Sequence, residues 1–133
     1  MNSGAIAVAA LAVVAGAVLL VHVLGATGAS GGHLLAPTDA RALIAERQGS
    51  EDFFVFDVRT PPEFASGHIE GAVNMPTGEV TEWMEPLPRD ATYLIYCATG
   101  VRSARVRSLM EEVGFGRVYE IESGYTAWQA AAR

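Results

Sequence analysis

The chain has 133 residues, half of them hydrophobic, and a formal net charge of −6. This length accommodates one compact domain and little more. Its single cysteine, Cys97, cannot form a disulfide within the chain, which excludes a disulfide scaffold. The acidic balance also argues against nucleic acid as a partner, because such binders need a surplus of basic side chains.

The charge is unevenly distributed along the chain. The first 38 residues carry no charged side chain, and the 9 basic and 15 acidic side chains all lie between Asp39 and Arg133. Residues 5–24 are apolar except for Gly16 and His22. A helix of that length spans roughly 30 Å, the thickness of the hydrocarbon core of a bilayer. We therefore predict a transmembrane helix over 5–24 that contacts the lipid bilayer, followed by a small-residue linker over 25–32.

A cleaved signal peptide is the alternative interpretation of this apolar segment. Small residues follow it, but no basic residue precedes it, and its apolar core is long for a signal peptide, so an uncleaved anchor is favoured. Arg41 and Arg47 follow the segment, which favours a single-pass membrane protein with an N-terminal anchor and a cytoplasmic domain. Ala12 and Gly16 form a small-xxx-small pair, which predicts at most a weak homodimer through the helix.

Residues 33–133 are expected to form one α/β domain with a mostly parallel sheet, because short apolar runs alternate with helical patterns. The continuous apolar runs 53–56 and 93–96 are typical of strands buried on both faces. Thr60 to Glu63 forms a capping box with proline at the first helical position. The expected strands are 34–35, 53–56, 72–73, 93–96 and 118–121. The expected helices run from Pro37 to Gly49, from Thr60 onward, from Val80 to Leu87, from Arg102 to Val113, and from Gly124 onward.

The loop between the strand at 93–96 and the next helix carries the chemistry. In open α/β sheets, ligands bind beyond the carboxyl ends of the strands, where Cys97 lies. The unpaired N–H groups of a helix N-terminus attract anions and would lower the pKa of a cysteine thiol. Arg102 adds a fixed cation, and Gly100 lets the backbone turn inward. We identify Cys97 as the candidate nucleophile, and the candidate substrate-binding residues are Ala98, Thr99, Gly100, Val101, Arg102 and Ser103.

Two other interpretations of these residues are weaker. A lone cysteine after a strand is often a buried small hydrophobe, but the strand, loop, arginine and helix together favour the nucleophile. The three histidines and Cys97 show no metal-ligand spacing, so no metal is expected. The chain has no lysine, so a phosphate-binding nucleotide loop is not expected either.

Several motifs together resemble a known family. In chain order they are Phe56-Asp57-Val58-Arg59, Pro62-Glu63-Phe64, Gly67-His68-Ile69-Glu70-Gly71-Ala72-Val73-Asn74-Met75-Pro76, Tyr96-Cys97, Thr99-Gly100-Val101-Arg102-Ser103, Gly114-Phe115, and Gly124 with Trp128. Their order and spacing over roughly residues 33–130 resemble a single rhodanese domain. The resemblance implies an α/β fold with a central parallel sheet flanked by helices, here preceded by the predicted transmembrane helix.

The same resemblance implies a sulfurtransferase of the thiosulfate:cyanide type. Cys97 would take a sulfane sulfur from a small sulfur-containing anion such as thiosulfate, or from a persulfide, and pass it to a thiol or cyanide acceptor. No cofactor is expected. Arg102 would orient the donor, Asp57 and Arg59 would form a supporting pair near the loop, and His68 would support the turn at Gly67.

Two departures from the family pattern bear on the donor. Ala98 stands where many relatives have arginine or lysine, so weak binding of a doubly charged donor such as thiosulfate is expected. Glu122-Ser123-Gly124 replaces the more usual pair of glycines before the last helix, which is expected to alter the edge of the pocket. One alternative function is a non-enzymatic, membrane-tethered sensing or docking module on the same fold. Phosphatase chemistry is less favoured, because four residues separate Cys97 from Arg102 where cysteine phosphatases have five.

Overall fold

The computed structural model describes residues 33–132, which lie in one compact unit, His33–Arg133. The predicted transmembrane helix (5–24), the linker (25–32) and the small-xxx-small pair lie outside these residues. Among residues 33–132, no helix is long and apolar enough to cross a membrane.

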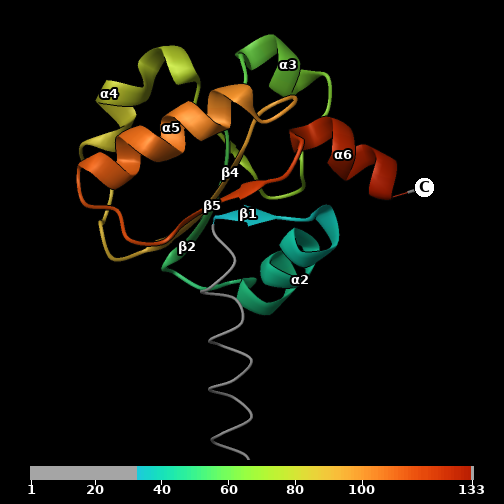
Figure 1. Cartoon of the computed structure of the whole chain (residues 1–133), viewed down its shortest axis with the longest axis horizontal. Coiled ribbons are helices and arrows are strands. Elements are labelled where there is room, and N and C mark those ends of the chain that lie inside the picture. Colours follow the sequence, from blue (N-terminus) through green and yellow to red (C-terminus); the bar gives the residue numbers. More distant parts are fainter. Residues whose placement is uncertain (1–32, 133) are drawn as a thin grey trace, which may run out of the picture. The chain divides into compact units, whose positions relative to one another are not determined.

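Strands and helices alternate along the chain (Figure 1). The strands are β1 (Leu34–Leu35), β2 (Phe53–Asp57), β3 (Val73–Asn74), β4 (Thr92–Tyr96) and β5 (Val118–Ile121). The helices are α2 (Pro37–Arg47), α3 (Pro61–Ala65), α4 (Val80–Met84), α5 (Val101–Glu112) and α6 (Gly124–Ala131), with a 3₁₀ turn η1 (Thr77–Glu79) before α4.

Most of the expected boundaries are confirmed to within two residues. The main difference is α4, which ends at Met84 and leaves Leu87 outside the helix. Glu85 still has helical angles, with a φ of −56° and a ψ of −47°, but Pro86 and Pro88 have no backbone N–H with which to continue the helical hydrogen bonds, which explains the early end. Leu87 instead donates its N–H to the carbonyl of Met84 in a turn and still packs against the core.

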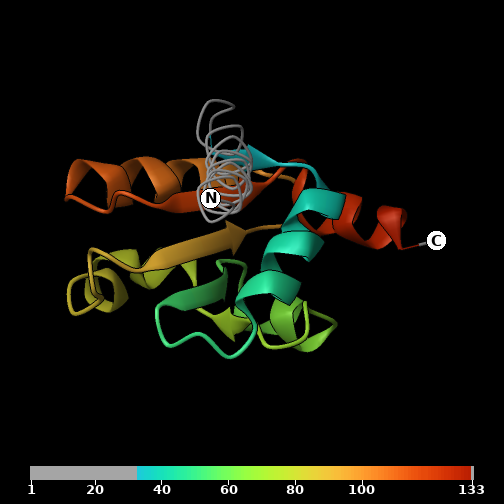
Figure 2. The ribbon, with the colours of Figure 1, turned by 90° about the horizontal axis from the view of Figure 1, so that it is seen from below.

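All strands of the sheet are parallel, in the order β1-β5-β4-β2-β3. The central strand β4 is buried along its whole length, as its apolar sequence predicts. Helices cover both faces, which confirms the expected fold class. Figure 2 shows α4 and α5 on one side of the strands and α2 and α6 on the other.

Alternation along the strands decides which side chains meet α5. Tyr93, Ile95 and Cys97 belong to the cluster packed by α4 and α5, whereas Leu94 and Tyr96 belong to the opposite cluster. In β5 the same alternation places Glu120 on the face of Val118, because residues two apart in a strand share a face. Cys97 and Glu120 therefore both lie beneath α5.

Candidate active site

Cys97 follows the last residue of β4 and is 1% exposed. Its Sγ accepts hydrogen bonds from the backbone N–H of Gly100, at 3.1 Å, and of Ser103, at 3.4 Å. Gly100 has a φ of 103°, a region that favours glycine, and it caps the N-terminus of α5. The loop thus turns its N–H groups toward the sulfur, as the sequence predicts.

The surroundings of Cys97 favour its ionised form. Burial by itself raises the pKa of the thiol, because it disfavours the charged state. Hydrogen bonds to the thiolate from the Ser103 side chain and from backbone N–H groups of the loop outweigh the burial, so the pKa of Cys97 lies below its ordinary value. A lower pKa increases the fraction of thiolate, which is the nucleophilic form of cysteine.

The other predicted loop residues contribute mainly through the backbone. Thr99 is exposed, Val101 is 78% exposed, and Ala98 is half-buried. Ser103 is fully buried, and the Cys97 thiol donates a hydrogen bond to its Oγ at 3.5 Å. Of these side chains, only that of Ser103 contacts the sulfur through a hydrogen bond.

Helix α6 holds the loop from the other side. The backbone N–H of Tyr125 donates to the carbonyl of Cys97 at 2.8 Å, and that of Thr126 donates to the carbonyl of Ala98 at 3.1 Å. The backbones approach so closely that a Cβ on Gly124 would lie 2.5 Å from the Cys97 carbonyl oxygen. Ser123, at the position of the missing glycine, has a left-handed φ of 58°. Position 124 therefore requires glycine, because any side chain there would collide with the Cys97 loop. Ser123 adopts a left-handed conformation that is unfavourable for residues other than glycine.

Arg102 stands at the rim of the loop and pairs with Glu63 of α3. Nη1 and Nη2 donate to the two carboxylate oxygens at 3.0 and 2.9 Å. The pairing lowers the pKa of Glu63 and raises that of Arg102. Thr60 caps α3 as predicted, with its Oγ1 accepting from the N–H of Glu63, but the Glu63 carboxylate binds Arg102 and the Thr60 hydroxyl instead of the Thr60 backbone. The predicted donor-binding cation therefore already has an anionic partner.

Asp57 and Arg59 form the supporting pair that the sequence predicts. The side chains are 0% and 6% exposed, and Arg59 Nη2 lies 2.6 Å from Asp57 Oδ2. The same Nη2 donates to the carbonyl of Gly67, and the guanidinium lies over the ring of Tyr125, 4.4 Å from its centroid. The pair joins the end of β2 to the segment after α3 and to α6. His68 stacks on Phe64 and contacts its carbonyl through Nδ1, consistent with the predicted support of the turn.

A buried charged group that we did not predict from the sequence lies next to the site. Glu120 in β5 is 1% exposed, accepts from the Ser103 hydroxyl at 2.8 Å, and pairs with Arg107 Nε at 2.6 Å. A signal for it exists in the sequence. Ser103, Arg107 and Glu111 follow one another at intervals of four on α5, and Glu120 shares its strand face with the buried Val118.

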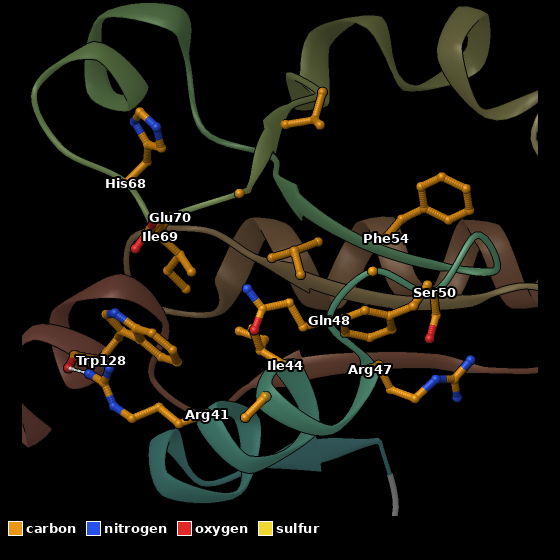
Figure 3. Close-up of a pocket in the computed structure, with 16 residues that line it drawn as sticks. Arg41, Ile44, Arg47, Gln48, Ser50, Phe54, His68, Ile69, Glu70 and Trp128 are labelled. Carbon is orange, nitrogen blue, oxygen red and sulfur yellow. Dashed lines mark hydrogen bonds between the residues drawn. The ribbon is translucent and has the colours of Figure 1, made fainter.

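The described residues also form a cavity of about 750 Å³ away from Cys97 (Figure 3). It lies between the C-terminal half of α2, the start of β2 and the segment 68–71. His68 lines it, but Cys97, the residues of its loop, Asp57 and Arg59 do not. Figure 3 shows the Arg41 side chain against the ring of Trp128, whose carbonyl it also binds. Within residues 33–132, no cluster of acidic, histidine and cysteine side chains could hold a metal ion.

Comparisons with known proteins identify relatives of this chain. A sulfurtransferase of Allochromatium vinosum is 33% identical over 90 residues, which cover 68% of this chain and 84% of the relative. The thiosulfate sulfurtransferase GlpE of Pseudoalteromonas translucida is 33% identical over 90 residues, covering 68% of this chain and 86% of the relative. A solved structure from Rhodopseudomonas palustris, described as a protein of unknown function and possible tyrosine phosphatase, is 30% identical with a TM-score of 0.66 and covers 77% of this chain and 83% of its own.

The family model described as rhodanese-like domain matches residues 37–131, most of the chain. The matched region includes the parallel sheet, the Cys97 loop and the α6 contacts described above. This chain belongs to the rhodanese-like domain family.

Proposed function

We propose that this protein is a sulfurtransferase that carries a sulfane sulfur on Cys97 as a persulfide. The observation that carries the proposal is a buried sulfur that accepts two backbone N–H groups, in a loop whose surroundings lower the pKa of the thiol. The sulfurtransferase names of the relatives support transfer chemistry in general.

In the first half-reaction the Cys97 thiolate attacks the outer sulfur of the donor. With thiosulfate, a new Sγ–S bond forms and the old S–S bond breaks, and its electron pair leaves on sulfite. With a persulfide donor, the pair leaves on the donor's thiolate. The N–H groups of Gly100 and Ser103 point at Sγ and would hold the sulfur while its charge moves outward.

In the second half-reaction an acceptor removes the outer sulfur. A thiolate or cyanide attacks it, the Sγ–S bond breaks, and the electron pair returns to Cys97 as thiolate. The product is a new persulfide or thiocyanate. No electrons are gained or lost overall, so the cycle needs no redox cofactor.

The charges around the loop favour a donor of low charge. The two terminal nitrogens of Arg102 bind Glu63, and position 98 is alanine, so the rim offers little uncompensated positive charge to a dianion. We propose that Arg102 still orients the donor through its remaining N–H groups. A persulfide donor, with one negative charge, suits this rim better than thiosulfate.

Mass spectrometry of the purified full chain tests the proposal. After incubation with thiosulfate, or with a low-molecular-weight persulfide, Cys97 should carry one added sulfur atom that cyanide removes as thiocyanate. Cys97→Ser should abolish transfer, whereas Thr99→Ser, which changes an exposed side chain of the same loop, should retain it. An unmodified Cys97 with donors of both classes overturns the proposal.

Phosphatase chemistry is the second candidate, because one solved relative is described in those terms. The loop argues against it, since it places four residues between Cys97 and Arg102, and Arg102 faces Glu63 instead of the interior of the loop. Phosphate release from an aryl phosphate that is lost in Cys97→Ser would reverse this preference.

We also propose, from the sequence, that residues 5–24 anchor the chain in a membrane with the domain on the cytoplasmic side. The full chain should then remain in the membrane fraction after alkaline carbonate extraction. Replacing Val13 and Val14 by arginine should release it. Recovery of the unaltered chain as a soluble protein lacking its first residues would show a cleaved signal peptide instead.

A further inference from the structure

The side chain of Glu120 is a buried acid that the proposed chemistry does not use. It projects from β5 toward α5, on the face that Cys97 shares, and it is 1% exposed. One carboxylate oxygen accepts from the Ser103 hydroxyl at 2.8 Å, and the other accepts from Arg107 Nε at 2.6 Å. In the described region, the Ser103 hydroxyl alone links this carboxylate to the Cys97 thiol through hydrogen bonds.

The Ser103 hydroxyl has one proton and three acceptors within reach. These are Glu120 Oε1 at 2.8 Å, the Gly100 carbonyl at 3.2 Å and Cys97 Sγ at 3.5 Å. A carboxylate at the shortest distance is the strongest of these acceptors. The hydroxyl proton therefore points to Glu120, and the Ser103 oxygen accepts the S–H of Cys97.

Charged neighbours keep Glu120 in this position. Arg107 binds it through Nε and binds Glu111 through Nη1, at 3.0 Å. Glu111 in turn lies 3.2 Å from His33 Nε2, before β1. These are the charged or titratable groups that face Glu120 from α5 and from the start of the domain.

On the other side, Cys97 is faced by a different set of charges. Arg102 of α5 acts on the thiol electrostatically and is paired with Glu63 of α3. Asp57 and Arg59, after β2, compensate each other. Glu120, by contrast, is connected to the Cys97 sulfur through the hydroxyl group of Ser103.

We propose that Glu120 is a positioning residue for the sulfur transfer: by holding the Ser103 hydroxyl proton, it restrains ionisation of Cys97 against the backbone N–H groups that favour it. The inference rests on the proposed function for its purpose, but the restraint is a property of the free thiol. When Cys97 ionises, its proton leaves to solvent, and the thiolate and the carboxylate then compete for one hydroxyl proton. A thiol restrained in this way stays more basic, and a more basic thiolate is the stronger nucleophile.

The pH dependence of alkylation of Cys97 by iodoacetamide tests the proposal on the full chain. Glu120→Gln keeps a carbonyl acceptor for Ser103 and leaves Arg107 paired with Glu111, so the fold should be retained. The midpoint of the alkylation profile should fall by on the order of one pH unit, because the competing negative charge is gone. Glu111→Gln, which removes the other partner of Arg107 but does not touch Ser103, should leave the midpoint unchanged.

A double-mutant cycle distinguishes a proton-orienting role from a field effect. If Glu120 acts through Ser103, Glu120→Gln in a Ser103→Ala background should shift the midpoint by less than half as much. A shift of equal size with and without Ser103 overturns the proposal, and so does an unchanged midpoint in the single variant. Faster alkylation at every pH with the same midpoint, which looser packing would produce, also overturns it.

The outcome is independent of the sulfur donor. A protein that accepts no sulfane sulfur but shows the predicted shift disproves the proposed function and retains the role of Glu120 in thiol ionisation. Normal persulfide formation with an unshifted alkylation profile supports the proposed function and disproves the role of Glu120.

Discussion

Arg102 and Glu63 form a two-point ion pair at the edge of the candidate active site, with N–O distances of 3.0 and 2.9 Å, although they are 39 residues apart in the chain. The pair joins α5 to α3 beside the Cys97 loop, which lies between α3 and α6 (Figure 1). It holds Arg102 at the rim of the Cys97 loop and compensates its charge. The strength of donor binding should therefore depend on Glu63 as much as on Arg102.

Replacing Glu63 by glutamine should strengthen the binding of an anionic donor. The side chains of Arg102 and Glu63 are 35% and 37% exposed, so the gain is worth about 1 kcal/mol, or roughly a fivefold lower KM for thiosulfate with kcat little changed. Steady-state kinetics measures this. Glu82→Gln removes the same charge from an exposed position on α4 and should have little effect; equal gains in both variants would show a general charge effect only.

The same pair should make stability depend on pH at the acid end. Arg102 lowers the pKa of Glu63 from its usual value of 4.5. Because the folded-state pKa is the lower one, the stabilisation is complete above the unfolded pKa and is lost as the pH falls through the folded value. Urea unfolding should show wild type more stable than Glu63→Gln at pH 7, by less than about 1 kcal/mol, and the difference should shrink as the pH falls below the usual value of 4.5. A difference that grows or stays constant as the pH falls would contradict this.

Gly124→Ala should lower transfer activity more than the positive φ of this residue alone would explain. Its Cβ would lie 2.5 Å from the Cys97 carbonyl oxygen and 2.7 Å from Ala98, so the loop must move. Transfer activity should fall by at least tenfold, and the Cys97 alkylation profile should change. Gly49→Ala is the matched control, since Gly49 has a φ of 82° but nothing within 4 Å of its Cβ position, so it carries the strain without the contact. Similar activity of the two variants would show that the contact with the loop does not cause the loss of activity.

Asp57→Asn should cost far more stability than the loss of an exposed ion pair. Arg59 would keep its charge in a site where it is 6% exposed, without the carboxylate that compensates it. Breaking a buried pair in this way costs about 3–5 kcal/mol. Asp52→Asn, which breaks the pair with Arg47 at the surface, should cost less than about 1 kcal/mol in the same urea titration. Comparable losses would show that the Asp57–Arg59 pair contributes little.

Much of the fold follows from local sequence patterns. The apolar runs that became β2 and β4 predict buried strands, because a parallel sheet covered by helices leaves no polar face. The proline and threonine at the start of α3 predict its first residue. The glycine in the Cys97 loop predicts a turn that directs N–H groups at the sulfur, and the structure shows this turn.

The sequence by itself determined the alternation of elements, the position of the candidate nucleophile and the family, since each depends on neighbouring residues or on motif spacing. Only the tertiary structure decided which charged side chains meet: Arg102 with Glu63, and Glu120 with Ser103 and Arg107. A charged residue in a local pattern indicates exposure, and its burial becomes favourable only when a partner arrives from another element. The order of the strands places β5 beside β4 and beneath α5, and for that reason a glutamate more than twenty residues beyond Cys97 controls the hydroxyl beside its sulfur in our proposal.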